Sequence, residues 1–232
     1  MLNLKGAGEI AVKGGWLSLT PAAFQCAVLD RAKLRRIKAR ETLHYEGDDS
    51  IGMYGLVGGS LKVMASAGEH GPYLVHMLWP GTWIGEGPTI TGRPRLVTPI
   101  ATECCDLLFL SRAAIHEIVR IEPRFWSLFL IPQQNLFELA VLAVADTMLP
   151  SHLKRLIATL LRLGGARSGP AKDAPGRIDL AFSQEEIAVM TNVTRPTAGR
   201  ALRRLAANGL IEVGYGRLTL TNIVGLQALL EE

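Results

Sequence analysis

The chain has 232 residues, of which 48% are hydrophobic and 20% charged, and its mean hydropathy is +0.22. This composition is typical of a globular protein and excludes disordered, collagen-like and fibrous chains; the length predicts one or two domains. The three cysteines are too few for a disulfide framework or a four-cysteine metal site. Residues 1–16 contain no sustained apolar stretch and so do not resemble a signal peptide, and Pro132 and its polar neighbours interrupt the apolar stretch 125–145. We therefore expect a cytoplasmic protein without a membrane span.

The net charge of +4 is unevenly distributed along the chain. Residues 1–149 contain fourteen Lys and Arg and fourteen Asp and Glu, whereas residues 150–232 contain eleven and seven. A basic module joined to a neutral one is typical of proteins that bind a polyanion. A solvated basic face with no partner has the same charge pattern, so charge alone does not decide between the two.

The first part of the chain predicts a β-rich domain. Thr20 as N-cap and Pro21 at the first helical position predict a short helix. Between residues 35 and 110, short apolar runs alternate with glycine-rich turns, and the clearest strands are 54–57, 61–65, 73–79 and 106–110. This rhythm favours a sandwich or rolled barrel over a parallel sheet. Both sides of 73–79 are apolar, so we expect both faces of this strand to be covered.

After residue 111 the pattern becomes helical. Residues 122–149 are long, apolar and free of glycine, and Pro132 predicts a kink or a break there. The apolar side chains lie on more than one face of this helix, which indicates burial on more than one side, most simply against a second copy. We place the domain boundary near residues 149–151; a further amphipathic helix over 151–163 and a loop over 164–176 follow it.

Residues 183–209 carry the most informative pattern. Ser183 and Glu186 form a capping box, in which each side chain accepts the backbone N–H of the other residue. Asn192 predicts a sharp turn because asparagine tolerates the left-handed conformation. Thr194 then caps a second helix, which Gly209 ends. A short helix, a tight turn and a longer helix form a helix-turn-helix.

The second helix of this motif presents arginines that would contact DNA. Arginine bidentate to guanine is the commonest specific base contact, and the start of a recognition helix reaches the bases. We expect Arg195, Thr197 and Arg200 to read bases. Residues 210–220 predict a β-hairpin wing, whose residue nearest a phosphate would be Arg217. The candidate DNA-binding residues are Ser183, Thr194, Arg195, Thr197, Arg200, Arg203, Arg204 and Arg217, the last three as phosphate contacts.

The order of these elements resembles the cyclic-AMP receptor protein/FNR (Crp/Fnr) family of bacterial transcription regulators. The matching stretches are Gly47-Asp48, 53–59, 80–86 and 183–211, and the resemblance runs from about residue 19 to residue 230. It implies a β-roll sensor domain, a long dimerisation helix and a C-terminal winged helix-turn-helix that binds a two-fold operator as a homodimer. RNA polymerase is a further candidate partner of such a regulator.

The resemblance also implies a candidate effector site. In nucleotide-binding relatives, a loop after a Gly-Glu pair cradles the cyclic phosphate. Gly85 would lend a backbone N–H, Glu86 would accept a ribose hydroxyl, and Arg95 would pair with the phosphate through its two-pronged guanidinium.

Four further positions depart from that pattern. The nucleotide binders have Ser or Thr and then Ala where this chain has Leu96 and Val97, and Ala140 and Val141 stand where binders offer hydroxyls to the base. Each buried polar group left without a partner costs roughly 1–3 kcal/mol. We therefore expect that the protein is not a conventional cyclic-AMP binder and that Glu86 and Arg95 form a structural ion pair. The alternative is a cyclic-nucleotide-dependent regulator that uses both residues; a form without any effector also remains open.

Other chemistries find little support in the residues. Iron–sulfur sensors of the family use four cysteines, mostly N-terminal, where this chain has Cys26 alone. Cys104 and Cys105 are strand neighbours that would point to opposite faces, and His76 is a lone histidine. We expect no iron–sulfur cluster, haem or metal. A β-roll metal-dependent enzyme, which needs two histidines and a carboxylate, is a remote alternative, and a module that docks a partner protein through its basic domain is another.

The predicted fold is therefore α+β and the predicted protein is not an enzyme. Residues 1–149 would form a β-roll sensor domain, a jelly roll like those that bind cyclic nucleotides, with a dimerisation helix at about 122–149. Residues 150–232 would form a winged helix-turn-helix that binds double-stranded DNA.

Overall fold

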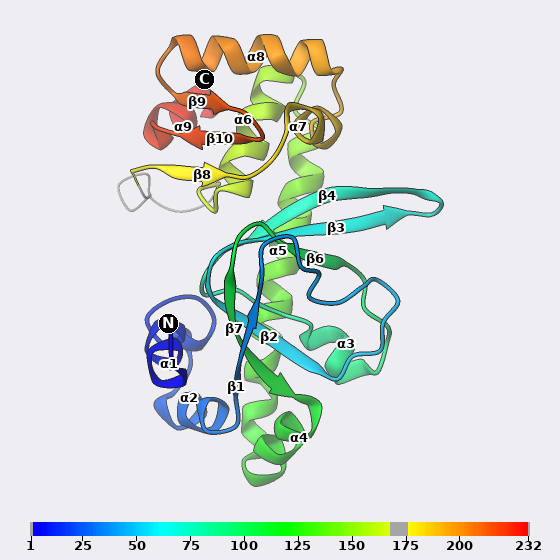
Figure 1. Cartoon of the computed structure of the whole chain (residues 1–232), viewed down its shortest axis with the longest axis vertical. Helices are drawn as coiled ribbons and strands as arrows, with labels where there is room; N and C mark the ends of the chain where they lie inside the picture. The colour runs from blue at the N-terminus through cyan, green and yellow to red at the C-terminus, as the bar shows by residue number, and fades with distance from the viewer. Residues whose placement is uncertain (1, 168–175, 232) are drawn as a thin grey trace. The chain divides into compact units, whose positions relative to one another are not determined.

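The structure is a computed structural model that describes residues 2–167 and 176–231 (Figure 1). The chain divides into two compact units, Met1–Phe137 and Glu138–Glu232, and this division falls within helix α5 (Ile131–Thr147). The boundary predicted near residue 149 lies after α5, so the two divisions differ in where they assign residues 138–149. The predicted loop over 164–176 lies mostly outside the described residues.

Two antiparallel sheets form the β-roll of the first unit (Figure 1). The four-stranded sheet has the order β1-β7-β2-β5 and the three-stranded sheet the order β4-β3-β6. All four strands predicted from sequence are present, as β2, β3, β4 and β7. The strands are β1 (Lys33–Ile37), β2 (Gly52–Gly58), β3 (Leu61–Ala67), β4 (His70–Leu78), β5 (Trp83–Ile84), β6 (Thr98–Ala101) and β7 (Cys105–Ser111).

Alternation along the central strands divides the core of this unit into two clusters. On β7, Leu107 faces a cluster that both sheets share, whereas Leu108 and Leu110 face a cluster built with the helices. Strand β2 is buried on both faces, because Tyr54 and Leu56 lie in the first cluster and Met53 and Val57 in the second. The expectation that residues 73–79 are covered on both faces is wrong, since Tyr73 and Val75 of β4 are exposed.

Helices cover the face of the four-stranded sheet that does not pack against the three-stranded sheet. They are α1 (Leu4–Ala11), η1 (Leu17–Leu19), α2 (Ala22–Leu29), α4 (Arg112–Ile121) and the 3-10 helix η2 (Pro123–Leu130), while α3 (Glu86–Thr91) follows β5. The buried rings of Trp16 and Phe24 pack edge-on, with centroids 5.6 Å apart, at the centre of this layer. The N-cap of α2 is Pro21 and not Thr20, whose hydroxyl donates to the Leu17 carbonyl at 2.7 Å.

The segment 122–149, in which Pro132 predicted a kink or a break, has two parts. Helix η2 has 3-10 geometry and ends at Leu130, and α5 begins at Ile131, so Pro132 lies in the first turn of α5, where its missing N–H is harmless. By length and composition alone, Pro123–Thr147 is apolar and long enough to cross a membrane, although little of it is buried. The expectation that no stretch meets this criterion is therefore wrong.

The second unit is a small helical domain with a three-stranded antiparallel sheet of order β8-β10-β9 (Figure 1). Helix α6 contributes eight consecutive buried residues, from Leu156 to Leu163, and begins at the predicted cap Ser151. The elements are α6 (His152–Leu163), β8 (Ile178–Leu180), α7 (Gln184–Met190), α8 (Arg195–Ala207), β9 (Ile211–Gly214), β10 (Arg217–Leu220) and α9 (Ile223–Glu231).

Candidate nucleic-acid interface and effector site

The capping box predicted from sequence begins helix α7. The Ser183 Oγ accepts a hydrogen bond from the Glu186 N–H at 3.2 Å, and the Glu186 carboxylate accepts one from the Ser183 N–H at 2.6 Å. Two of the orphan donors at the helix start are thereby satisfied. Ile187 and Ala188 are buried beneath the helix, so α7 packs on the domain through the expected face.

The turn between α7 and α8 has the predicted backbone. Asn192 has φ 49°, in the left-handed region that asparagine tolerates better than most residues. Sequence analysis did not single out Thr191, which is 1% exposed and donates its hydroxyl to the Ile187 carbonyl at 2.7 Å. Asn192 thus provides the backbone of the turn, and Thr191 closes the end of α7.

Helix α8 begins at Arg195, with Thr194 at the N-cap in extended conformation. The predicted cap bond to the backbone is absent; the Thr194 hydroxyl lies instead 3.0 Å from the hydroxyl of Thr197. Pro196 falls in the first turn, as predicted. The inner face is apolar, with Ala198, Leu202 and Leu205 buried.

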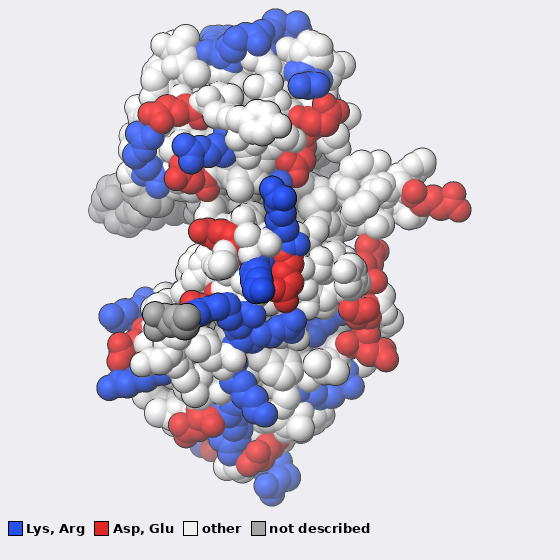
Figure 2. Space-filling view, in the orientation of Figure 1, with Lys and Arg blue, Asp and Glu red and all other residues white. Residues whose placement is uncertain are grey.

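The outer face of α8 is basic. Arg195, Arg200, Arg203 and Arg204 are all exposed, and Figure 2 shows Lys and Arg side chains gathered along this helix. The Arg200 Nη2 donates to the Thr197 Oγ1 at 3.1 Å, which ties together two of the predicted base-reading residues. Such a face suits the phosphates and guanine edges of a duplex.

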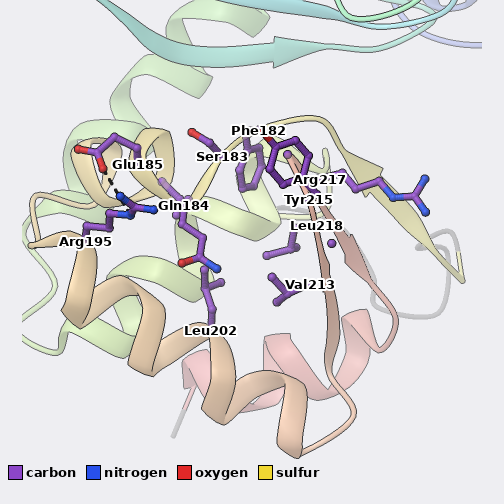
Figure 3. Close-up of a pocket in the computed structure, with 13 residues that line it drawn as sticks. Phe182, Ser183, Gln184, Glu185, Arg195, Leu202, Val213, Tyr215, Arg217 and Leu218 are labelled. Atoms are coloured by element: carbon purple, nitrogen blue, oxygen red, sulfur yellow. Dashed lines mark ion pairs between the residues drawn. The ribbon is translucent and has the colours of Figure 1, made fainter.

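The predicted wing is present as the hairpin of β9 and β10, whose register pairs Arg217 with Gly214. Its tip carries Tyr215, which is fully exposed, and Arg217, which is also exposed. A hollow of about 430 Å³ lies between the wing, the start of α7 and α8 (Figure 3). Its lining includes Ser183, Arg195 and Arg217, so the fold brings these three candidates around one depression.

Two residues at this hollow were not singled out from sequence. Glu185, on the first turn of α7, lies 3.8 Å from the Nε of Arg195, measured to its Oε2 (Figure 3). No sequence signal indicates this pair, because ten residues and a turn separate its members. Tyr215 lies between two glycines at a hairpin tip, and this sequence pattern could have predicted its exposure.

In the first unit, Arg95 is buried and turned toward the main chain. Its side chain is 3% exposed, its Nη2 donates to the Gly52 carbonyl at 2.6 Å, and its Nη1 lies 3.4 Å from the Gly85 carbonyl oxygen. Gly85 has φ 90°, and a Cβ there would overlap Arg95 Nη1. Burial is the main cause that lowers the pKa of this guanidinium.

Glu86 lies beside Arg95 in the chain fold but does not pair with it. In the described part of the chain, the structure records no ion pair within 4.0 Å for Glu86, and its Oε2 is buried without a hydrogen-bond partner. Burial raises the Glu86 pKa to about 6. The structural ion pair expected between Glu86 and Arg95 is therefore wrong: the arginine donates to main-chain carbonyls, and the Oε2 of Glu86 has no hydrogen-bond partner.

The other effector candidates differ in exposure. Leu96 is 76% exposed, while Val97 is half-buried against the core that both sheets share. Ala140 and Val141 are exposed on α5, in the second unit. His44, half-buried near Tyr54, has its pKa lowered to about 4 by burial first and by the Arg95 charge second.

The histidines and cysteines that were considered for metal or redox chemistry do not form a common site in the described part of the chain. Within residues 2–167 and 176–231, no three His, Cys, Asp or Glu side chains lie close enough together to hold a metal ion. Cys104 is exposed and Cys105 buried, as their alternation on a strand predicts, and burial raises the Cys105 pKa to about 11. A thiol of such a pKa is a poor nucleophile at neutral pH.

Two family models match the chain. Residues 34–122 match the cyclic nucleotide-binding domain and residues 154–229 the Crp-like helix-turn-helix domain. The cAMP-activated global transcriptional regulator CRP of Escherichia coli is 22% identical over 184 residues, or 79% of this chain and 87% of that protein. The HTH-type transcriptional regulator Cmr of Mycobacterium tuberculosis is 27% identical over 158 residues, or 67% of this chain and 59% of that protein.

Solved structures share the fold. A putative cyclic nucleotide binding protein from Ruegeria pomeroyi has a TM-score of 0.68 at 17% identity, with both chains covered in full. The c-di-GMP responsive global regulator CLP of Xanthomonas campestris has a TM-score of 0.64 at 20% identity, over 86% of this chain and 99% of that one. With a cyclic nucleotide-binding domain followed by a Crp-like helix-turn-helix, the chain belongs to the Crp/Fnr family of DNA-binding transcription regulators and not to a family of enzymes.

Proposed function

We propose that this regulator acts in the cytoplasm as a homodimer that binds a two-fold operator, and that its β-roll does not sense cyclic AMP in the conventional way. Residues 1–149 would serve for sensing and dimerisation and residues 150–232 for DNA binding, with RNA polymerase as a further partner at promoters. The observation that carries the proposal is the exposed arginine face of α8 beside an exposed wing.

On DNA, the roles divide by position along α8. Arg195, Thr197 and Arg200 lie in the first turns, which enter the major groove, and are assigned to bases. Arg203 and Arg204 lie farther along, and with Arg217 of the wing they are assigned to phosphates. Ser183 and Thr194 stand at the starts of α7 and α8, where helix N-termini favour a phosphate.

Dimerisation is supported by a stripe of exposed apolar side chains on and just after α5. Phe137, Val141, Val144 and Met148 are 51–76% exposed, and their spacing of four, three and four residues places them along one side of the helix. This spacing is the heptad pattern of helices that pair with another helix. A membrane is a poorer explanation, because Glu138 and the polar run at 133–135 lie within the same segment.

The effector proposal rests on Arg95. A guanidinium that donates to the Gly52 carbonyl and abuts Gly85 would have to give up these contacts to reach a phosphate. One observation favours the alternative, a cyclic-nucleotide-dependent regulator: the unpaired Oε2 of Glu86 could accept a hydroxyl donor from a ribose. No effector at all is the third outcome.

Fluorescence anisotropy with labelled duplex from upstream of the gene tests the proposal, with and without cyclic AMP. We expect tight binding that weakens steeply with salt and does not respond to the nucleotide. Binding that appears only with cyclic AMP would support the alternative, and salt-insensitive or absent binding would refute DNA recognition.

A single substitution tests the assignment of Arg200 to a base. Arg200→Ala should weaken operator binding by roughly 1–3 kcal/mol and relax selectivity at one base pair. Competition with duplexes altered at single positions measures both quantities. An equal loss on every sequence would make Arg200 a phosphate contact instead.

A further inference from the structure

An acidic side chain stands on the surface that should meet DNA. Glu185 is 65% exposed at the first turn of α7, and its Oε2 lies 3.8 Å from the Nε of Arg195, which is 71% exposed at the first position of α8 (Figure 3). A carboxylate there repels phosphates, so it weakens binding to any duplex. A carboxylate in the first turn of α7 interacts favourably with the helix dipole, and beside Arg195 it can also act on recognition.

The contact is made on one edge of the guanidinium. Glu185 approaches Nε, which leaves the two Nη groups at the far end of Arg195 available for a bidentate contact with a guanine. In the described residues, Glu185 is the polar partner that the structure records for the Arg195 side chain. The hollow of about 430 Å³ beside Arg195 gives this long side chain room to leave that orientation.

The other arginines of α8 lack this arrangement. Arg200 contacts the hydroxyl of Thr197, a neutral group, and no ion pair is recorded for Arg203 or Arg204 within the part of the chain that the structure describes. Arg195 is thus distinguished from them by a carboxylate 3.8 Å from its Nε, an exposed ion pair longer than a hydrogen bond. An arginine whose orientation is already restricted loses less side-chain entropy when it binds its base. On a duplex that lacks this base pair, neither Arg195 nor Glu185 gains a favourable contact.

We propose that Glu185 is a positioning residue for DNA recognition: it holds the Arg195 fork toward one base pair and lowers the affinity for duplexes that lack this base pair. The proposal rests on the proposed function, since it requires that α8 reads DNA. It makes Glu185 a determinant of specificity, although its charge opposes binding.

The test compares discrimination between base pairs. Wild-type protein selects an operator from a random duplex pool, and anisotropy then gives Kd for this operator and for each single base-pair replacement in one half-site. Glu185→Gln keeps the shape of the side chain and removes its charge. We expect discrimination at one base pair to fall about threefold to tenfold, at the same position where Arg195→Ala lowers it further without removing it completely, with the other positions unchanged.

The matched control is Glu212→Gln. Glu212 is another exposed carboxylate of this domain, paired with Arg177 at 2.6 Å, so its loss changes net charge equally without touching Arg195. It should shift every Kd by a common factor. In the double variant Glu185→Gln/Arg195→Ala, discrimination at that position should equal that of Arg195→Ala alone, because the glutamate acts through the arginine.

Each outcome bears on the proposal. If Glu185→Gln tightens all duplexes by one factor, as Glu212→Gln does, Glu185 is only a repulsive charge and the inference is wrong while DNA recognition stands. If the double variant loses discrimination beyond Arg195→Ala, Glu185 acts independently of Arg195 and the positioning role is refuted. If the wild type selects no sequence, the proposed function itself fails.

Discussion

A buried carboxylate between two arginines should be the most sensitive polar site of the second unit. Asp146, near the end of α5, is 2% exposed, and its two oxygens lie 3.2 Å from the Nε of Arg162 and 3.1 Å from the Nε of Arg167. Arg162 comes from α6 and is itself 5% exposed at its side chain. The three charges therefore join the end of α5 to α6 and to the chain after it.

Asp146→Ala removes the negative charge from this site and leaves a buried guanidinium behind. Burial lowers the pKa of Arg162, which shows that its charged form is disfavoured even beside the carboxylate. Removing one partner of a buried ion pair costs roughly 3–5 kcal/mol. Because a domain has a total stability of only about 5–15 kcal/mol, this variant should lose a large part of it.

Urea unfolding followed by far-UV circular dichroism measures the loss. All four tryptophans lie between residues 16 and 126, so tryptophan fluorescence reports on the first unit in the same experiment. The control Glu212→Ala breaks an exposed pair, which contributes little to stability because water solvates both charges. If Asp146→Ala costs no more than Glu212→Ala, the argument from buried charge is refuted.

Two further predictions concern the first unit and the dimer. Burial raises the pKa of Glu86 from its ordinary value of 4.5, which applies to the unfolded state, to about 6 in the folded state. The folded state therefore binds more protons between these pH values, and the free energy of unfolding should fall by about 2 kcal/mol as pH rises through this window. Glu86→Gln should remove that fall in urea titrations at stepped pH; an unchanged pH profile would contradict it. Val144→Asp should give a monomer in analytical ultracentrifugation. The control Leu96→Asp, which changes another exposed apolar side chain, should leave a dimer. If both variants remain dimeric, the apolar stripe on α5 is not the interface.

The helix-turn-helix could be predicted from the sequence because its signals are local. Ser183 and Glu186 cap a helix whatever lies around them, and Asn192 and Gly209 mark backbone that few residues adopt. Each signal acts within about four residues, so a single sequence contains the whole motif. The apolar face by which α8 packs on the domain could be predicted from the helical spacing of its apolar residues alone.

Elements held by tertiary contacts could not be predicted. The resemblance implied a loop after Gly85 and Glu86, and the structure has helix α3 there, six residues that include a proline and a glycine. Contacts from outside the helix support it: the Ser50 hydroxyl lies 2.7 Å from that of the buried Thr89, and Arg112 of α4 donates to the Pro88 carbonyl. Only the folded chain brings these groups together, and the same is true of Glu185 and Arg195.

The contacts of Arg95 limit which ligands could bind at the candidate effector site. The sequence placed an arginine at a spacing suited to a phosphate, but the structure uses it to donate to the Gly52 carbonyl, which the Ser50 hydroxyl also reaches at 3.4 Å, so moving Arg95 loses its own main-chain contacts. A cyclic nucleotide would have to compensate for that loss and supply a donor to Glu86 at once. A ligand that engages Glu86 alone leaves Arg95 on its main-chain carbonyls, whereas a ligand that engages Arg95 alone leaves the Oε2 of Glu86 buried without a partner, so a ligand with both an anion and a hydroxyl donor would suit this site best.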